Sequence, residues 1–199
     1  MFFIRLVALI LMGSSVMAAT KTAERDLTQL RSIGLAGGDS IYIFTSARCP
    51  HCADFHKDIL PEIIKKYAKT GRAKVFFVDD ASDSEAINAS MLARCLPIDK
   101  SEDFLTQVFK HQSDWLRQSN SRDKLMKYAV TAGLTKQEAQ NCLANFELRT
   151  AMQDQWMNLS KLYNVLYLPT VVVRRGNSVK TYTGANKAAV LNGMEYDFQ

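Results

Sequence analysis

The sequence predicts an α/β protein whose sheet domain is interrupted by an inserted all-helical subdomain. Three observations predict it: a strand–helix–strand pattern over residues 41–78, a helical stretch over residues 82–164, and strand patterning again from residue 167. Strands that alternate with amphipathic helices are typical of parallel βαβ units. An apolar fraction of 47% in 199 residues is enough to bury a core. Beyond the N-terminus no run reaches the about 18 apolar residues of a membrane-spanning helix.

The N-terminal residues predict export. Arg5 precedes an apolar run over residues 6–12, and Ala18 supplies the small residue of a cleavage site. We therefore expect residues 1–18 to be a signal peptide, with a short N-terminal core helix as the alternative. Cleavage would remove Arg5 and lower the net charge from +5 to +4. An exported chain meets an oxidising compartment, in which disulfides persist.

Residues 19–38 are expected to be an N-terminal extension with one short helix, on which Leu27, Leu30 and Ile33 form the apolar stripe. Residues 39–81 are expected to form the first part of the sheet domain. Its first strand covers residues 41–45, and its second covers residues 75–78. Between the strands an amphipathic helix begins at Pro50, and Pro61 should split it.

Residues 82–164 are expected to be the helical insertion. Two Ser/Thr-x-x-Glu patterns, at residues 82–85 and 135–138, indicate capping boxes at helix starts. Ser101 and Ser121 are expected to begin two further helices, His111 to lie on the surface, and Trp115 and Trp156 to pack the subdomain core. Residues 165–199 are expected to complete the sheet domain with a strand, a hairpin turn at Gly176-Asn177, a second strand and a closing helix.

Cys49-Pro50-His51-Cys52 is the most informative motif. A helix that begins at Pro50 places Cys49 at the N-cap, where free backbone N–H groups and the helix dipole stabilise a thiolate. Cys52 then lies in the first turn and faces the core. His51 lies beside the first sulfur, and its partial charge would stabilise the thiolate further. The spacing thus predicts an attacking sulfur at Cys49, a resolving sulfur at Cys52 and a lowered pKa for Cys49.

Three other interpretations of this cysteine pair remain open. The pair could be a purely structural disulfide, a chance occurrence, or half of a zinc site completed by His51 or His56. The strand before it and the amphipathic helix after it favour redox chemistry. No metal ion and no cofactor are expected. The basic residues form no stripe with interleaved aromatic residues, so nucleic-acid binding is not expected either.

Cys95 and Cys142 form the second pair. Both lie on apolar faces of helices within the insertion, 47 residues apart. We expect a structural disulfide, which would stabilise the fold by ~3–4 kcal/mol in the chain-entropy model. Free buried thiols and a second redox pair are the alternatives.

Residues 41–78, with Cys-Pro-His-Cys between strand and helix, resemble the thioredoxin fold. The Pro-His dipeptide, the signal peptide and the large helical insertion resemble the DsbA family of bacterial periplasmic disulfide oxidoreductases. The resemblance therefore implies a thioredoxin-like fold with an inserted all-helical subdomain, and Cys49 as the sulfur that forms mixed disulfides. It further implies that Leu168-Pro169-Thr170 is a cis-proline loop opposite the cysteines, which binds an extended substrate strand.

The chain departs from the family at two places. The strand over residues 41–44 has no acidic residue, so the proton acceptor for Cys52 is unidentified. Leu168 stands where members of the family usually have Val or Thr.

The resemblance implies a periplasmic thiol:disulfide oxidoreductase that introduces disulfides into exported proteins. Its expected partners are unfolded or reduced exported proteins and a membrane redox partner of the DsbB type, and we expect a monomer. One alternative is a disulfide isomerase or reductase. The other is a peptide-binding chaperone in which the cysteine pair is merely structural.

Overall fold

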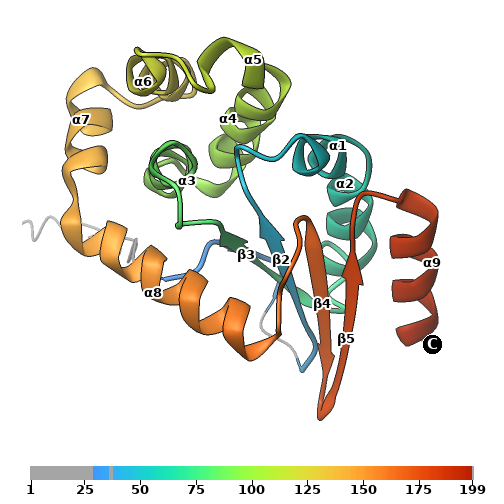
Figure 1. Cartoon of the computed structure of the whole chain (residues 1–199). Helices are drawn as coiled ribbons and strands as arrows, with labels where there is room; N and C mark the ends of the chain where they lie inside the picture. Colours follow the sequence, from blue (N-terminus) through green and yellow to red (C-terminus); the bar gives the residue numbers. More distant parts are fainter. Residues whose placement is uncertain (1–28, 36–37, 199) are drawn as a thin grey trace, which may run out of the picture.

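The computed structural model describes residues 29–35 and 38–198. The expected signal peptide, residues 1–18, and most of the expected extension lie outside them. Figure 1 shows one mixed sheet with helices on both faces and a group of helices beyond one end. The elements are β1 (Ser32–Ile33), β2 (Ser40–Thr45), α1 (Pro50–Asp58), α2 (Leu60–Ile63), the π-helical turn η1 (Ile64–Ala68), β3 (Lys74–Asp79), α3 (Ser84–Cys95), α4 (Ile98–Lys110), α5 (Gln112–Trp115), α6 (Ser121–Thr131), α7 (Lys136–Ala144), α8 (Phe146–Leu162), β4 (Thr170–Arg175), β5 (Ser178–Thr183) and α9 (Lys187–Asp197).

Strand β2 lies at the centre of the sheet, whose strand order is β1-β3-β2-β4-β5. β2 runs parallel to β3 and antiparallel to β4, and Ile43 is paired with Phe77 on one side and with Val171 on the other. The parallel β2–α1–β3 unit confirms the sequence prediction. A central strand covered on both faces needs apolar side chains at successive positions, which explains the run Ile41–Phe44.

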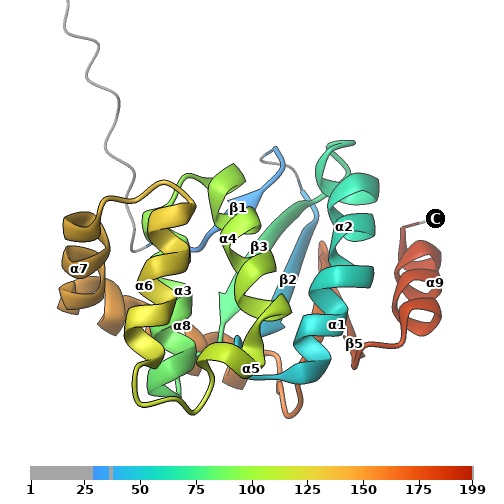
Figure 2. The same ribbon diagram turned by 90° about the horizontal axis from the view of Figure 1, so that it is seen from above.

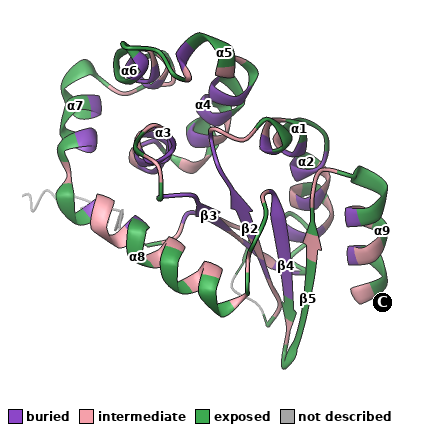
Figure 3. Cartoon of the chain, viewed as in Figure 1, coloured by how far each residue is buried: buried purple, intermediate pink, exposed green. Residues whose placement is uncertain are grey.

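Helices cover both faces of this sheet (Figure 2). Helices α1, α2 and α9 pack on one face, where Ile43, Phe55 and Val173 belong to the same buried cluster. The second half of α8 packs on the other face, where Trp156 and Tyr163 contact Phe44 edge to face. Most residues of the central strands are buried, whereas the outer surfaces of α8 and α9 are exposed (Figure 3).

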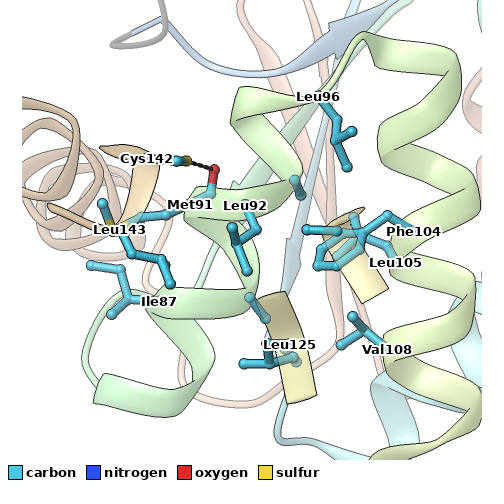
Figure 4. Close-up of a cluster of buried hydrophobic side chains, with 14 of the residues drawn as sticks. Ile87, Met91, Leu92, Leu96, Phe104, Leu105, Val108, Leu125, Cys142 and Leu143 are labelled. Carbon is cyan, nitrogen blue, oxygen red and sulfur yellow. Dashed lines mark hydrogen bonds between the residues drawn. The ribbon is translucent and has the colours of Figure 1, made fainter. Parts of the chain in front are cut away.

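Helices α3 to α7, which we call the helical subdomain, surround a second apolar core. α3 lies in its middle and contributes buried residues from both of its sides (Figure 4). A disulfide joins Cys95 at the end of α3 to Cys142 in α7. The first half of α8 also packs on this core through Leu148 and Met152, so α8 connects the two cores.

Several expected helix starts lie elsewhere in the structure. α3 begins after Asp83, whose carboxylate accepts the N–H groups of Glu85 and Ala86, rather than at a capping box on Ser82. Ser101 begins no helix, because α4 already starts after Pro97 and Ser101 is buried within it. In contrast, the capping box at Thr135 is confirmed.

The expected helix over residues 19–38 is wrong for the residues that the structure describes. Ser32–Ile33 forms the short strand β1, which pairs antiparallel with β3. The pairing partner of β1 is about 40 residues away along the chain, so a local helical stripe could not predict it.

A buried group of charges joins the sheet to the helical subdomain. Asp79, at the end of β3, lies 3.7 Å from the guanidinium of Arg31 and 4.0 Å from that of Arg94 in α3. Arg31 also pairs with Glu102 in α4, and its guanidinium lies 4.1 Å from the centre of the Phe77 ring. The side chains of Asp79 and both arginines are at most 6% exposed. Asp79 is therefore the anion between two buried cations.

Among the described residues, no helix combines the length and the apolar character that a membrane crossing requires.

Replacing Asp79 by Asn should lower the free energy of unfolding by about 3–5 kcal/mol, because it leaves two buried arginines with too little negative charge. Urea denaturation of the parent and variant measures this difference. Asp154→Asn is the matched control, since Asp154 is exposed in the middle of α8 and should change stability by less than about 0.5 kcal/mol. Equal effects of the two substitutions would contradict the role given to Asp79.

The double variant Cys95→Ala/Cys142→Ala should lose ~3–4 kcal/mol of stability, because its unfolded chain is no longer cross-linked over 47 residues. Denaturant unfolding of the oxidised proteins provides the measurement. The variant Cys49→Ala/Cys52→Ala serves as the control because it retains this disulfide. A loss below about 1 kcal/mol would show that the bridge is not a major structural restraint.

Candidate active site

The turn from β2 into α1 carries the two free cysteines. Cys49 is the N-cap of α1 with an extended backbone (φ −85°, ψ 120°), and Pro50 is the first helical residue. Pro50 suits this position because the first helical N–H groups have no partner within the helix. Cys52 is fully buried in the first turn, whereas Cys49 is half-buried and His51 exposed. The helix start thus exposes one sulfur and shields the other, as the sequence predicts.

The environment of Cys49 favours its thiolate. Its pKa falls from 9.0 to about 6, chiefly because the Cys52 thiol hydrogen-bonds to its sulfur. Burial opposes this effect, while the backbone N–H groups of Cys52 and His51 and the charge of His51 assist it. The sequence predicted the helix-terminus and His51 contributions. It did not predict that the neighbouring thiol makes the largest contribution.

Cys52 has the opposite environment. The pKa of this thiol lies far above its usual value, first because it hydrogen-bonds to the Cys49 sulfur and second because it is buried. The negative charge of Asp80 raises the pKa of Cys52 further, while the backbone N–H of Ser46, 3.5 Å from the sulfur, acts in the other direction. The two shifts run in opposite directions, so Cys49 is the thiol of the pair that loses its proton more readily.

The loop before β4 lies opposite the cysteines. The Leu168–Pro169 peptide bond is cis, and the carbonyl oxygen of Leu168 lies 3.7 Å from the Cys49 sulfur. The buried Thr170 hydroxyl donates to the carbonyl of Tyr167 at 2.7 Å and also contacts the Thr183 hydroxyl in β5. The structure thus brings Leu168 to the Cys49 sulfur, while Thr170 holds the loop through Tyr167 and Thr183 and, like Pro169, does not line the cleft beside Cys49.

A cleft of about 580 Å³ adjoins the Cys49 sulfur. Its lining includes Leu166 and Tyr167, which are 72% and 71% exposed. Polar and charged side chains also line it. The lining residues are Ser46, Arg48, Cys49, Asp80, Ser82, Asp83, Trp156, Val165, Leu166, Tyr167 and Leu168. As candidate site residues, sequence reasoning identified only Cys49 and Leu168 in this set, because the other residues belong to no motif that indicates redox chemistry or substrate binding.

The remaining candidates lie outside the cleft. Cys95 and Cys142 are bonded to each other within the helical subdomain. His56, considered as a possible zinc ligand, packs its ring 4.0 Å from that of Phe109, and burial followed by the charge of Arg31 lowers its pKa to about 3. Within residues 29–35 and 38–198, no three His, Cys, Asp or Glu side chains gather as metal ligands.

Comparison with solved structures finds the same fold in α-DsbA1 and BdbD. Wolbachia pipientis α-DsbA1 superposes with a TM-score of 0.74 at 17% identity, over 85% of this chain and 90% of that one. Oxidised BdbD from Bacillus subtilis gives a TM-score of 0.70 at 18% identity, over 87% of this chain and 95% of that one.

Curated relatives match in sequence as well. A protein from Rickettsia bellii (strain RML369-C), provisionally named a protein-disulfide oxidoreductase, is 27% identical over 139 residues, which are 69% of this chain and 52% of that protein. One with the same provisional description from Rickettsia conorii is 30% identical over 103 residues, 51% of this chain and 37% of that protein. The chain therefore spans about half, or less, of these relatives' length.

The family assignment rests on a match to most of the chain. The family model described as thioredoxin covers residues 35–187, from before β2 to the first residue of α9. This stretch contains the central β2–α1–β3 unit, the helical subdomain and the loop that faces the cysteines. The protein belongs to the thioredoxin family.

Proposed function

We propose that this protein is a thiol:disulfide oxidoreductase that introduces disulfides into exported proteins through Cys49 and Cys52. The observation that carries the proposal is the unequal ionisation of the two thiols beside an open cleft. Cys49 has a pKa of about 6 and faces the cleft, while Cys52 is buried and stays protonated. The provisional names of the Rickettsia relatives also support it.

The reaction transfers two electrons from the substrate to the enzyme disulfide. A substrate thiolate attacks the Cys49 sulfur, the bond between Cys49 and Cys52 breaks, and the Cys52 sulfur leaves and takes up a proton. A second substrate thiolate then attacks the substrate sulfur of the mixed disulfide, and Cys49 leaves as the thiolate. The products are a substrate disulfide and the reduced Cys49–Cys52 pair.

The leaving groups indicate whether the protein oxidises or reduces its substrates. A thiol with a low pKa leaves more readily, and a stabilised thiolate favours the dithiol form, so the corresponding disulfide is a stronger oxidant. Cys49 fulfils both conditions. We therefore propose oxidation rather than reduction of substrates as the forward reaction.

The cleft supports extended polypeptide as the substrate. Its lining offers the exposed side chains of Leu166 and Tyr167 to a substrate, and Leu168 places a backbone carbonyl beside the reacting sulfur. In the DsbA-like assignment, a membrane protein of the DsbB type accepts the two electrons and restores the disulfide. The proposed location is the periplasm, reached through the signal peptide over residues 1–18, and the proposed oligomeric state is a monomer.

A redox titration against glutathione tests the direction of the reaction. We expect a potential well above the about −270 mV of thioredoxin. A potential as low as that value would contradict oxidation and favour a reductase or isomerase. In parallel, the oxidised protein should introduce disulfides into a reduced substrate more efficiently than it rearranges a scrambled one. Cys49→Ala should abolish both activities, whereas a variant with full biological activity would favour the chaperone alternative.

The pH dependence of Cys49 alkylation tests the ionisation of the site. In the reduced protein the rate should rise as the pH increases through about 6 and then level off, because only the thiolate reacts. Cys52→Ala should move this midpoint upward, since it removes the hydrogen bond that contributes most to the lowered pKa. Cys52→Ser keeps an O–H donor and should move it less. Equal midpoints in the three proteins would refute this account of Cys49.

A further inference from the structure

Gln112 contacts the active-site turn from the helical subdomain. It is the first residue of α5 and is half-buried. Its side-chain nitrogen donates to the carbonyl oxygen of Ala47 at 2.8 Å and to that of Cys49 at 3.1 Å. An amide nitrogen carries two hydrogens, so both of its donors are used on this turn. One side chain therefore holds the backbone before and at the N-cap of α1.

The two carbonyls have different surroundings. The Cys49 carbonyl accepts the first helical bonds from the N–H groups of Cys52 (3.1 Å) and Ala53 (3.2 Å), so it determines where α1 begins. Ala47 is 4% exposed and lies in the turn before the helix. A buried carbonyl needs a hydrogen-bond partner, and Gln112 provides one. Gln112 thus fixes the orientation of the Ala47–Arg48 and Cys49–Pro50 peptide units.

Several contacts hold the turn before α1. The backbone N–H of Cys49 donates to the carbonyl of Ser46 at 3.0 Å, so the backbone conformation at the N-cap depends on this turn. Arg48 is tied to Asp83 and lies 3.9 Å from Glu85, but its side chain is 34% exposed, and pairs of this kind hold weakly. Gln112 adds two hydrogen bonds to this turn from the helical subdomain.

The position of the Cys49 sulfur depends on this turn. The thiolate is stabilised only while the sulfur stays within hydrogen-bond reach of the Cys52 thiol and of the backbone N–H groups of His51 and Cys52. A small rotation of the turn would lengthen these contacts together, because all three partners lie in the first turn of α1. The Leu168 carbonyl, 3.7 Å from the sulfur, would lose its alignment as well.

We infer that Gln112 is a positioning residue for the Cys49 nucleophile, acting through the carbonyls of Ala47 and Cys49. The helical subdomain then takes part in setting the reactivity of the cysteine pair as well as covering the sheet domain. This inference rests on the proposed function only in that Cys49 is taken as the reacting sulfur.

Gln112→Met tests the inference, because it keeps the length of the side chain and removes both donors. In the reduced full chain, the ultraviolet absorbance of the Cys49 thiolate should titrate about one pH unit higher than in the parent, a tenfold change in the ionisation constant. The equilibrium constant with glutathione should shift in the same proportion toward the protein disulfide. Gln118→Met is the matched control, since Gln118 is exposed on the same segment and should leave both readouts unchanged.

Gln112→Asn tests whether the length of the side chain matters as well as its amide group. It keeps the amide but shortens the side chain by one methylene group, so it should shift the thiolate midpoint as Gln112→Met does. It also serves as the test variant if circular dichroism shows that Gln112→Met is not folded. A midpoint equal to that of the parent in a folded Gln112 variant would overturn the inference, as would an equal shift in Gln118→Met.

The same titration separates this inference from the proposed function. If the parent protein titrates near the ordinary thiol value, Cys49 is not an activated nucleophile and the proposed function fails. If the parent titrates near pH 6 and the Gln112 variants do so too, only the role of Gln112 is lost.

Discussion

The attraction between Asp79 and two buried arginines orients the rest of the molecule. Arg31 precedes β1, Asp79 ends β3 and Arg94 lies in α3, so one anion fixes three segments that are distant in sequence. Arg31 also forms an ion pair with Glu102, which connects α4 to this group of charges. Because α5 follows α4 directly, the placement of α4 also determines where Gln112 meets the turn before α1. The geometry at the cysteines therefore depends on charges buried at the junction of the two cores.

Two chemically identical thiols acquire opposite properties within one turn of helix. Cys49 stands at the open end of α1, where backbone N–H groups and the Cys52 thiol all donate toward its sulfur. Cys52 is buried, its thiol donates a hydrogen bond to the Cys49 sulfur, and the charge of Asp80 raises its pKa further. Each thiol thus accounts for much of the shift in the other, which is the behaviour of a coupled pair that shares one proton.

Local patterns in the sequence predict the features that depend on neighbouring residues. The apolar run Ile41–Phe44 predicts the central strand, and Pro50 predicts the helix start that places Cys49 at the N-cap. Two features that depend on distant partners were not predicted. β1 exists through its pairing with β3, and Gln112 reaches a turn 63 residues away in sequence. At Ser101 a local pattern gave a wrong prediction. Its side chain suits a helix N-cap, but Ser101 lies buried within α4, which begins at Ile98.

The strand order determines when the two edges of β2 can be paired during synthesis of the chain. The chain leaves the sheet after Asp79 and re-enters it only at Thr170, so one edge of the central strand β2 stays unpaired until β4 has been synthesised. The carbonyl of Leu168 reaches the Cys49 sulfur only then. A nascent chain that has not yet reached Leu168 carries both cysteines without the loop that faces them. During that interval no residue of this loop lies beside the Cys49 sulfur.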